Sequence, residues 1–189
     1  MLEWATLHPE ANLSFVTAVA HLKKEPRHQM QALSIELLQY EGTINMSQKI
    51  NIDAQIKMGE AVNTGQLELL RDVIAPSVVD HDPAADQGKG PEGFIHFFTE
   101  FREAFPDLSI AVEHLVADDN NVAFAYTITG THKGDFLGIA PTGKKIKARG
   151  MQISRFEDGK IVERWGSSDE LGILQQVGAM KPATSTVPV

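Results

Sequence analysis

The chain has 189 residues, of which 42% are hydrophobic, and this length suits one well-packed domain with an appendage. Its formal net charge of -8 at pH 7 would repel a phosphate backbone, which excludes nucleic-acid binding as a main function. Because the chain has no cysteine, disulfides, thiolate metal sites and a cysteine nucleophile are excluded as well.

The N-terminal residues show no export or membrane signal. No apolar run reaches the ~20 residues that a bilayer-spanning helix needs. Glu10 and Asn12 interrupt the first hydrophobic stretch, and no basic segment precedes it, so a secretory signal is not predicted. We therefore expect a cytoplasmic protein without a membrane partner.

The first part of the chain is predicted to be helical and separate from the rest. Residues 10–24 and 27–40 both have helical patterns, and in the second the apolar residues recur at i, i+3, i+7 and i+8. We interpret residues 1–45 as a helical extension and residues 46–180 as the main domain. Small and proline-punctuated residues at 181–189 predict a flexible tail.

The main domain is predicted to open with helices. Residues 52–62 and 66–74 form two of them, joined at Gly65, because glycine commonly follows a helix C-terminus. A short extended piece at 78–81 leads into a loop rich in proline, aspartate and glycine. Proline then opens a helix over 91–105.

The helix over 91–105 carries an aromatic stripe. Four phenylalanines recur at i, i+3, i+4 and i+7, namely Phe94, Phe97, Phe98 and Phe101. Such a stripe is more typical of a core-facing helix surface than of a ligand site. Phe97 and Phe101 are nevertheless candidate substrate-binding residues, because a pocket beside the core would use the same face.

The second half of the domain is predicted to be a sheet. Strands are expected at 108–117, 121–132, 145–156 and 160–167, followed by a helix at 169–178. Helices first, then an antiparallel meander, then a closing helix indicate an α+β domain with helices packed on one face of a curved sheet.

Alternation along the middle strands predicts which side chains face the helices. In one strand the apolar face holds Val122, Phe124, Tyr126, Ile128, Gly130 and His132. In the next strand the inward set is Ile146, Ala148, Gly150, Gln152, Ser154 and Phe156. The small members of this set leave space, and Gln152 points a polar group into it, so we expect a pocket. Tyr126 and Gln152 are therefore candidate substrate-binding residues.

The last strand places Glu163 and Trp165 on one face. If Trp165 faces inward as a pocket residue, Glu163 faces inward too, unless a bulge intervenes. Glu163 is then either a buried carboxylate with a partner or a rim residue in a structural pair. We favour the second interpretation, because burying a charge without a partner is costly.

Asp169 follows the last strand directly and is the candidate catalytic base. In an apolar pocket, desolvation would favour its protonated form and suit it to proton transfer beside a carbonyl. The alternative is structural. The pattern from Ser167 to Glu170 resembles a capping box, which would make Asp169 a first-turn residue stabilised by the helix dipole.

Two histidines are further candidates. His132 on the apolar face is more typical of a satisfied core histidine, although it could donate a hydrogen bond during catalysis. His81, between two aspartates at a loop start, could line a pocket mouth or be a solvated loop residue. A metal site from His81, Asp82, Asp86 and His96 has no diagnostic spacing, so no metal is predicted.

Two segments resemble a known family. They are Gly-Thr-His-x-Gly-x-Phe-x-Gly-x-x-Pro-Thr-Gly at residues 130–143 and the end of the sheet at residues 158–169. Over about residues 55–178 the chain is similar to the SnoaL-like polyketide cyclases, whose fold is nuclear-transport-factor-2-like. The resemblance implies a cone-shaped barrel with a curved antiparallel sheet, helices on its concave face, a deep pocket and a homodimer through the outer sheet face.

The resemblance also bears on chemistry. In such cyclases an aspartate at the position of Asp169 acts as general acid and base in an intramolecular aldol closure without metal or cofactor. We therefore expect aldol-type cyclisation or isomerisation of a small, apolar, carbonyl-bearing molecule, with His132 or Gln152 as hydrogen-bond donor to the enolate oxygen. The alternative is a non-catalytic ligand-binding or protein-interaction module.

Overall fold

The computed structural model describes residues 45–180, so the predicted helices at 10–24 and 27–40 and the predicted tail lie outside the described residues. The division at residue 45 stays a prediction. The described elements are α2 (Met46–Thr64), η1 (Leu67–Leu69), α3 (Leu70–Val73), β1 (Ile74–Asp80), α4 (Gly90–Ala104), β2 (Ser109–Ala117), β3 (Asn121–Thr131), β4 (Lys145–Glu157), β5 (Lys160–Ser168) and α5 (Glu170–Val177).

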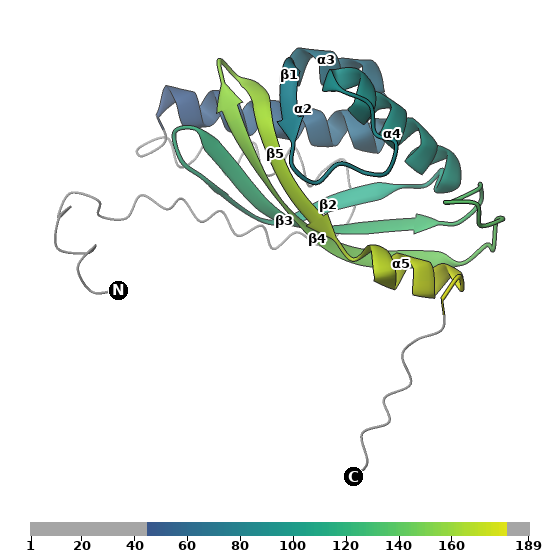
Figure 1. Ribbon diagram of the computed structural model, residues 1–189. Coiled ribbons are helices and arrows are strands. Elements are labelled where there is room, and N and C mark those ends of the chain that lie inside the picture. Colours follow the sequence, from purple (N-terminus) through teal and green to yellow (C-terminus); the bar gives the residue numbers. More distant parts are fainter. Residues whose placement is uncertain (1–44, 181–189) are drawn as a thin grey trace, which may run out of the picture.

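The five strands form one curved sheet in the order β1-β5-β4-β3-β2. β1 runs parallel to β5, and the other neighbours are antiparallel. Figure 1 shows α2, α3 and α4 on one side of this sheet, which curves around them. We call the side that they cover the inner face and the opposite side the outer face. The predicted α+β architecture is confirmed.

The first helix begins earlier than predicted, at Met46 rather than residue 52. Its start is a capping box, because the Asn45 side chain accepts from the Gln48 backbone while the Gln48 side chain accepts from the Asn45 backbone. The predicted end is confirmed, since Gly65 adopts the left-handed conformation with φ 77°.

The predicted helix over 66–74 is wrong at its end. η1 and α3 stop at Val73, and Ile74 already belongs to β1. β1 continues through Pro76, which a strand tolerates here because β1 lies at the edge of the sheet. Buried Ile74 pairs with Ile161 of β5, so tertiary pairing overrides the local helical pattern.

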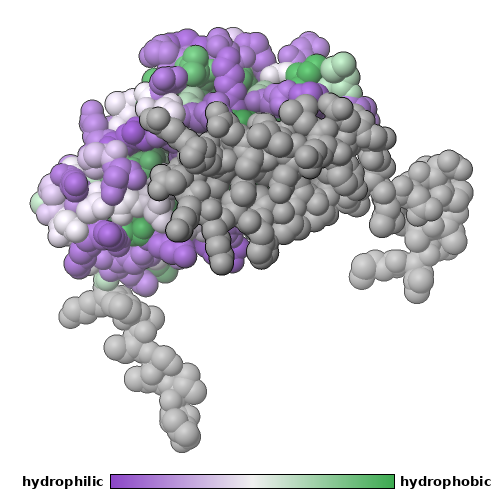
Figure 2. Space-filling view, turned by 180° about the vertical axis from the view of Figure 1, so that it is seen from behind, coloured by the Kyte–Doolittle hydropathy of each residue, from purple (hydrophilic) through white to green (hydrophobic). Residues whose placement is uncertain are grey.

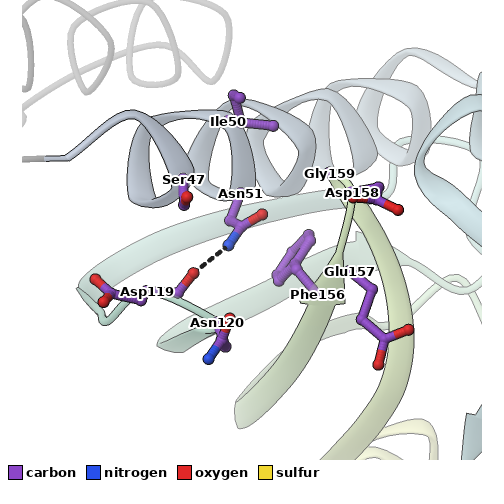
Figure 3. A pocket seen from close by; sticks show the side chains of 9 residues that line it. All are labelled: Ser47, Ile50, Asn51, Asp119, Asn120, Phe156, Glu157, Asp158 and Gly159. Carbon is purple, nitrogen blue, oxygen red and sulfur yellow. Dashed lines mark hydrogen bonds between the residues drawn. The ribbon is translucent and has the colours of Figure 1, made fainter.

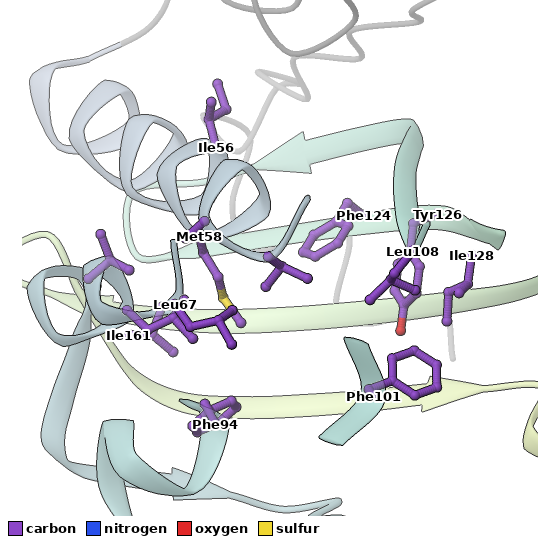
Figure 4. Close-up of a cluster of buried hydrophobic side chains, with 14 of the residues drawn as sticks. Ile56, Met58, Leu67, Phe94, Phe101, Leu108, Phe124, Tyr126, Ile128 and Ile161 are labelled. Carbon is purple, nitrogen blue, oxygen red and sulfur yellow. The ribbon is translucent and has the colours of Figure 1, made fainter. Parts of the chain in front are cut away.

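Alternation in β3 and β4 is confirmed along both inward sets, which are buried in the structure. Figure 4 shows the resulting core between the helices and the inner face of the sheet. Met58 of α2 and Phe94 and Phe101 of α4 belong to it. The sheet contributes residues such as Phe124 of β3 and Ile161 of β5. The part of the described surface visible in Figure 2 is mainly hydrophilic, with scattered hydrophobic areas. Among residues 45–180, no helix combines the length and hydropathy needed to cross a bilayer.

The closing helix α5 covers the backbone edge of β4 that β5 leaves unpaired. The Gln176 side chain accepts from the Lys147 backbone N at 2.8 Å and donates to the Lys147 carbonyl at 3.1 Å. The Asp169 backbone N donates to the Arg149 carbonyl at 2.9 Å. These bonds protect the strand edge and fix the position at which β5 passes into α5.

Candidate functional site on the inner face

A register shift in β5 decides which of its side chains face inward. Ile161 pairs with inward-facing Phe156, but beyond the shift Arg164 pairs with inward-facing Ser154. Trp165 therefore pairs with Ile153, which faces outward and is 46% exposed. The expectation that Trp165 faces the pocket is wrong, because the irregularity exchanges the two faces of the strand.

Two glycines give two long side chains room to lie along the inner face. A Cβ atom at Gly166 would overlap the guanidinium of Arg164, and one at Gly150 would overlap the ring of Tyr126. The sequence suggested that the small residue at Gly150 leaves an open space, but it does not. Tyr126 occupies that space, and its hydroxyl lies over the strand next to Ser168, the partner of Gly150 in β5.

Arg164 is the centre of the polar contacts on this face. Its Nη1 donates to both carboxylate oxygens of Asp80, at 2.9 and 3.0 Å, and to the Asp82 carbonyl at 3.2 Å. Its Nε donates to Gln152 Oε1 at 3.1 Å. The Arg164 side chain is 18% exposed and that of Asp80 8%, so this ion pair is largely shielded from solvent.

The polar contacts continue across the sheet to α2. Gln152 Nε2 donates to Ser154 Oγ at 2.9 Å, and Ser154 Oγ donates to Gln55 Oε1 at 2.9 Å. All three side chains are buried, and each finds a partner, as buried polar groups require. Gln152 is thus held from both ends of its amide, with one N–H left over.

Tyr126 adds a neutral donor to this group. Burial raises the pKa of Tyr126, and the charge of Arg164 and a hydrogen bond with Ser168 only partly oppose this. Its hydroxyl therefore stays protonated at neutral pH and can donate a hydrogen bond. We call the set Asp80, Tyr126, Gln152, Arg164 and Ser168 the inner polar cluster.

Asp169 directly follows Ser168 of the inner polar cluster in the chain and is exposed. It is the N-cap of α5, because its Oδ1 accepts from the Gly172 backbone N at 2.8 Å. Gly172 is needed there, since a Cβ atom would overlap the carboxylate. The cap that the alternative interpretation placed at Ser167 is thus formed by Asp169. Its role in proton transfer stays a prediction.

His132 lies apart from the cluster. It is fully buried beside Phe105, with ring centroids 5.4 Å apart, and its Nδ1 is 3.0 Å from Thr142 Oγ1. Its Nε2 has no hydrogen-bond partner among residues 45–180. No hydrogen bond within these residues joins His132 to Arg164 or Tyr126, so its expected role as a donor stays a prediction.

His81 and Trp165 lie together on the outer face. Their rings stack at 4.5 Å with an interplanar angle of 5°. His81 Nε2 is 2.9 Å from Glu163 Oε2, and Arg155 Nε donates to Glu163 Oε1 at 2.6 Å. These two hydrogen bonds, that with His81 first, lower the pKa of Glu163. Glu163 is therefore in a structural pair, as the favoured interpretation had it.

The six candidate substrate-binding residues are thus divided between the two faces. Tyr126 and Gln152 are on the inner face, and His81 and Trp165 are on the outer face. Phe101 is buried in α4 and stacks on Phe97 at 5.7 Å, within an aromatic cluster that includes Phe105 and Phe136. In the described part of the chain, no group of three or more His, Cys, Asp or Glu could hold a metal ion.

The outer face also carries exposed apolar side chains. Met151 is 67% exposed, and Val79 and Ile153 are exposed as well. Ile153 pairs with Trp165, so these residues lie on adjoining strands β1, β4 and β5. This is the face on which the family resemblance places a homodimer, and that assembly stays a prediction.

A hollow of about 670 Å³ lies away from the inner polar cluster. It separates the start of α2 from the β2–β3 and β4–β5 turns (Figure 3). Asn51 of α2 bridges it by donating to the Asp119 carbonyl at 3.0 Å. Its lining is Ser47, Ile50, Asn51, Asp119, Asn120, Phe156, Glu157, Asp158 and Gly159. None of the predicted site residues belongs to it.

The packing of Tyr126 over Gly150 gives the first testable prediction. Replacing Gly150 with alanine is expected to lower the free energy of unfolding by about 1–3 kcal/mol, because the new methyl group displaces a buried ring. Urea unfolding at neutral pH measures the change. The control is Gly88→Ala, where the added Cβ meets nothing closer than 3.5 Å. Equal effects of the two substitutions would contradict the described packing.

The fold and the motifs of the chain agree with one family. Residues 52–177 match the sequence profile described as SnoaL-like polyketide cyclase. Because this match spans well over half of the chain, the protein belongs to the SnoaL-like polyketide cyclase family, with the nuclear-transport-factor-2-like fold.

Characterised relatives are similar over most of their length. The chain is 28% identical to the aklanonic acid methyl ester cyclase DauD of Streptomyces sp. (strain C5) over 138 residues, which cover 69% of this chain and 83% of the relative. It is 27% identical to the nogalonic acid methyl ester cyclase of Streptomyces nogalater, over 64% of this chain and 92% of the relative.

Solved structures of other proteins are also similar to this chain. The structure of IdmH from Streptomyces antibioticus is 35% identical, with a TM-score of 0.59, and the match covers 67% of this chain and 96% of that chain. TsrD from Streptomyces laurentii has a TM-score of 0.65 at 24% identity, covering 72% and 99%, which shows a shared fold.

Proposed function

We propose that this protein is a cyclase that closes a ring by intramolecular aldol addition in a small, largely apolar, carbonyl-bearing molecule. Its membership of the SnoaL-like family and its similarity to two named methyl ester cyclases support this. The observation that carries the proposal is the inner polar cluster, whose member Ser168 directly precedes Asp169 in the chain. A guanidinium and a neutral phenol lie together on the inner face, and Asp169 follows one residue after the cluster.

In the proposed reaction Asp169 removes a proton from the carbon next to a carbonyl. Its Oδ1 is occupied by the Gly172 backbone N, which leaves Oδ2 for the substrate proton. The resulting enolate carbon attacks a second carbonyl carbon of the same molecule, and one C–C bond forms. The attacked oxygen takes up the proton from Asp169 and becomes a hydroxyl. Product and substrate therefore have the same composition, and the chain's own side chains supply the acid and base.

Gln152 is the better placed of the two predicted donors to the enolate oxygen. It lies within the inner polar cluster, and its amide has one N–H beyond the bond to Ser154. His132 lies against the rings of Phe105, which directly follows α4, and Phe136, between β3 and β4, and a donor there requires the substrate to reach its Nε2.

The test is turnover of a substrate named by the relatives. The full chain is incubated with aklanonic acid methyl ester, and the products are separated by liquid chromatography with mass detection. We expect a product of unchanged mass and altered retention that accumulates in proportion to protein concentration. Acceptance of nogalonic acid methyl ester is tested in parallel. If neither ester is consumed faster than without protein, a cyclase of this specificity is contradicted.

A non-catalytic ligand-binding protein is the second candidate, and one observation favours it. Asp169 is exposed and already serves as the N-cap of α5, so capping alone accounts for an aspartate at this position. A binding protein would retain the ester tightly and return it unchanged. Isothermal titration combined with the turnover assay separates the two candidates.

A further inference from the structure

We propose that Arg164 is a catalytic residue whose Nη2 donates a hydrogen bond to the substrate oxygen on which negative charge develops, with the Tyr126 hydroxyl as second donor. This rests on the proposed function and extends it to a residue that the alternation pattern did not single out. Three features support this role: the guanidinium has free donors, it is rigidly held, and the two side chains converge.

The guanidinium of Arg164 has donors to spare. It carries five N–H groups, of which Nε is bonded to Gln152 and Nη1 to Asp80 and Asp82. Nη2 lies over Gly166, and none of its hydrogen bonds goes to a residue of the described 45–180 range. Because 18% of the Arg164 side chain is exposed, the guanidinium side chain is not sealed off from solvent.

The free end of Arg164 is rigidly supported. Asp80 holds Nη1 with both carboxylate oxygens, at 2.9 and 3.0 Å. Gln152 fixes Nε from the other side. A donor fixed in this way needs no reorganisation when charge develops on the substrate, which is the condition for effective oxyanion stabilisation.

The register brings the two donors to one place. Ser168, Gly166 and Arg164 of β5 pair in turn with Gly150, Gln152 and Ser154 of β4. Arg164 lies over Gly166 in the direction of Ser168, while Tyr126 lies over Gly150 toward the same residue. The charge of Arg164 acts on the Tyr126 hydroxyl, and the phenol stays neutral because it is buried. A charged donor and a neutral donor thus face one position.

A purely structural role for Arg164 predicts a different result from the proposed role as a hydrogen-bond donor. Through Asp80 and the Asp82 carbonyl, Arg164 also fastens the segment after β1 to β5. If this were its only role, loosening that segment by another substitution would have the same effect on the site. Gln87→Ala does so, because it removes a bond to Asp80 and leaves the guanidinium in place.

The experiment measures binding of an oxyanion and needs no turnover. The probe is para-nitrophenol, whose phenolate is distinguished from the phenol by visible absorbance, and para-nitroanisole serves as the neutral analogue. Arg164→Gln is expected to weaken phenolate binding by ~10–100-fold, the loss of one charge-assisted hydrogen bond, and to change binding of the neutral analogue much less. Tyr126→Phe is expected to weaken phenolate binding by a smaller factor.

Two variants serve as controls. Arg164→Lys keeps a charge for Asp80 and hence the fold, but it lacks the planar fork, so we expect the same loss of selectivity as in Arg164→Gln. Gln87→Ala should keep the wild-type preference for phenolate. The proposal is overturned if wild type has no such preference, if Arg164→Lys retains it, or if Gln87→Ala loses as much. Selective phenolate binding without ester turnover would contradict the proposed cyclase function but not the binding of an oxyanion by Arg164.

Discussion

Replacing Asp169 with asparagine is expected to slow cyclisation by ~10²–10⁴-fold while leaving the fold intact, because general-base catalysis contributes about this much. Asparagine keeps the shape of the side chain and the acceptor for the Gly172 backbone N, so α5 remains capped. It cannot accept the substrate proton. The measurement is the single-turnover rate of the methyl ester assay, together with the melting temperature of the variant.

The cap and the carboxylate are separated by a second substitution. Asp169→Ser also provides a good N-cap but has no carboxylate, so its stability should stay near that of wild type while its rate falls as in Asp169→Asn. A variant that is stable and still active would remove Asp169 as the base. A variant that loses rate only in proportion to its loss of fold would assign Asp169 to capping alone.

Removing the Asp80 carboxylate is expected to have the largest effect on stability. Asp80→Ala leaves the Arg164 guanidinium without its counter-ion on a largely shielded face, which should lower the free energy of unfolding by about 3 kcal/mol. The substitution also frees Gln87 and the segment that follows β1. Urea unfolding followed by circular dichroism measures the change.

The matched control removes an exposed ion pair. Asp53→Ala breaks the contact with Lys49, two residues that lie on the surface of α2, and should leave stability unchanged. Replacing Asp80 and Arg164 together with leucines should recover part of the loss, because no unpaired charge then remains. If Asp80→Ala costs no more than Asp53→Ala, the inner polar cluster is not an energetically coupled unit.

Much of the sheet could be predicted because one of its faces is buried. Strict alternation in β3 and β4 follows from burial of one side only, so inward-facing residues such as Tyr126 and Gln152 were correctly assigned from the period of two. The left-handed conformation of Gly65 and the closing helix could be predicted equally well, since both depend on neighbouring residues in the sequence.

The site could not be predicted as well, because it depends on pairing between distant segments. The irregular pairing of β4 with β5 turns Trp165 outward and Arg164 inward, and the alternation of apolar residues in β5 does not mark it. Filling of the space over Gly150 by Tyr126 depends likewise on the register of two strands. One signal was available, since Arg164, Gly166 and Ser168 alternate as a polar set that suits the polar partner Gln152.

Solvent exchange tests the central claim, acid and base chemistry on a carbonyl compound at the inner polar cluster, most directly. β-Tetralone, an aromatic ketone, is incubated in deuterium oxide with wild type, Asp169→Asn and Arg164→Lys, and deuterium uptake at the carbon next to the carbonyl is followed by nuclear magnetic resonance. We expect wild type to accelerate uptake above the buffer rate, Asp169→Asn to abolish most of this acceleration, and Arg164→Lys to reduce it by a smaller factor. Uptake at the buffer rate with wild type, or equal acceleration by all three proteins, would contradict the account.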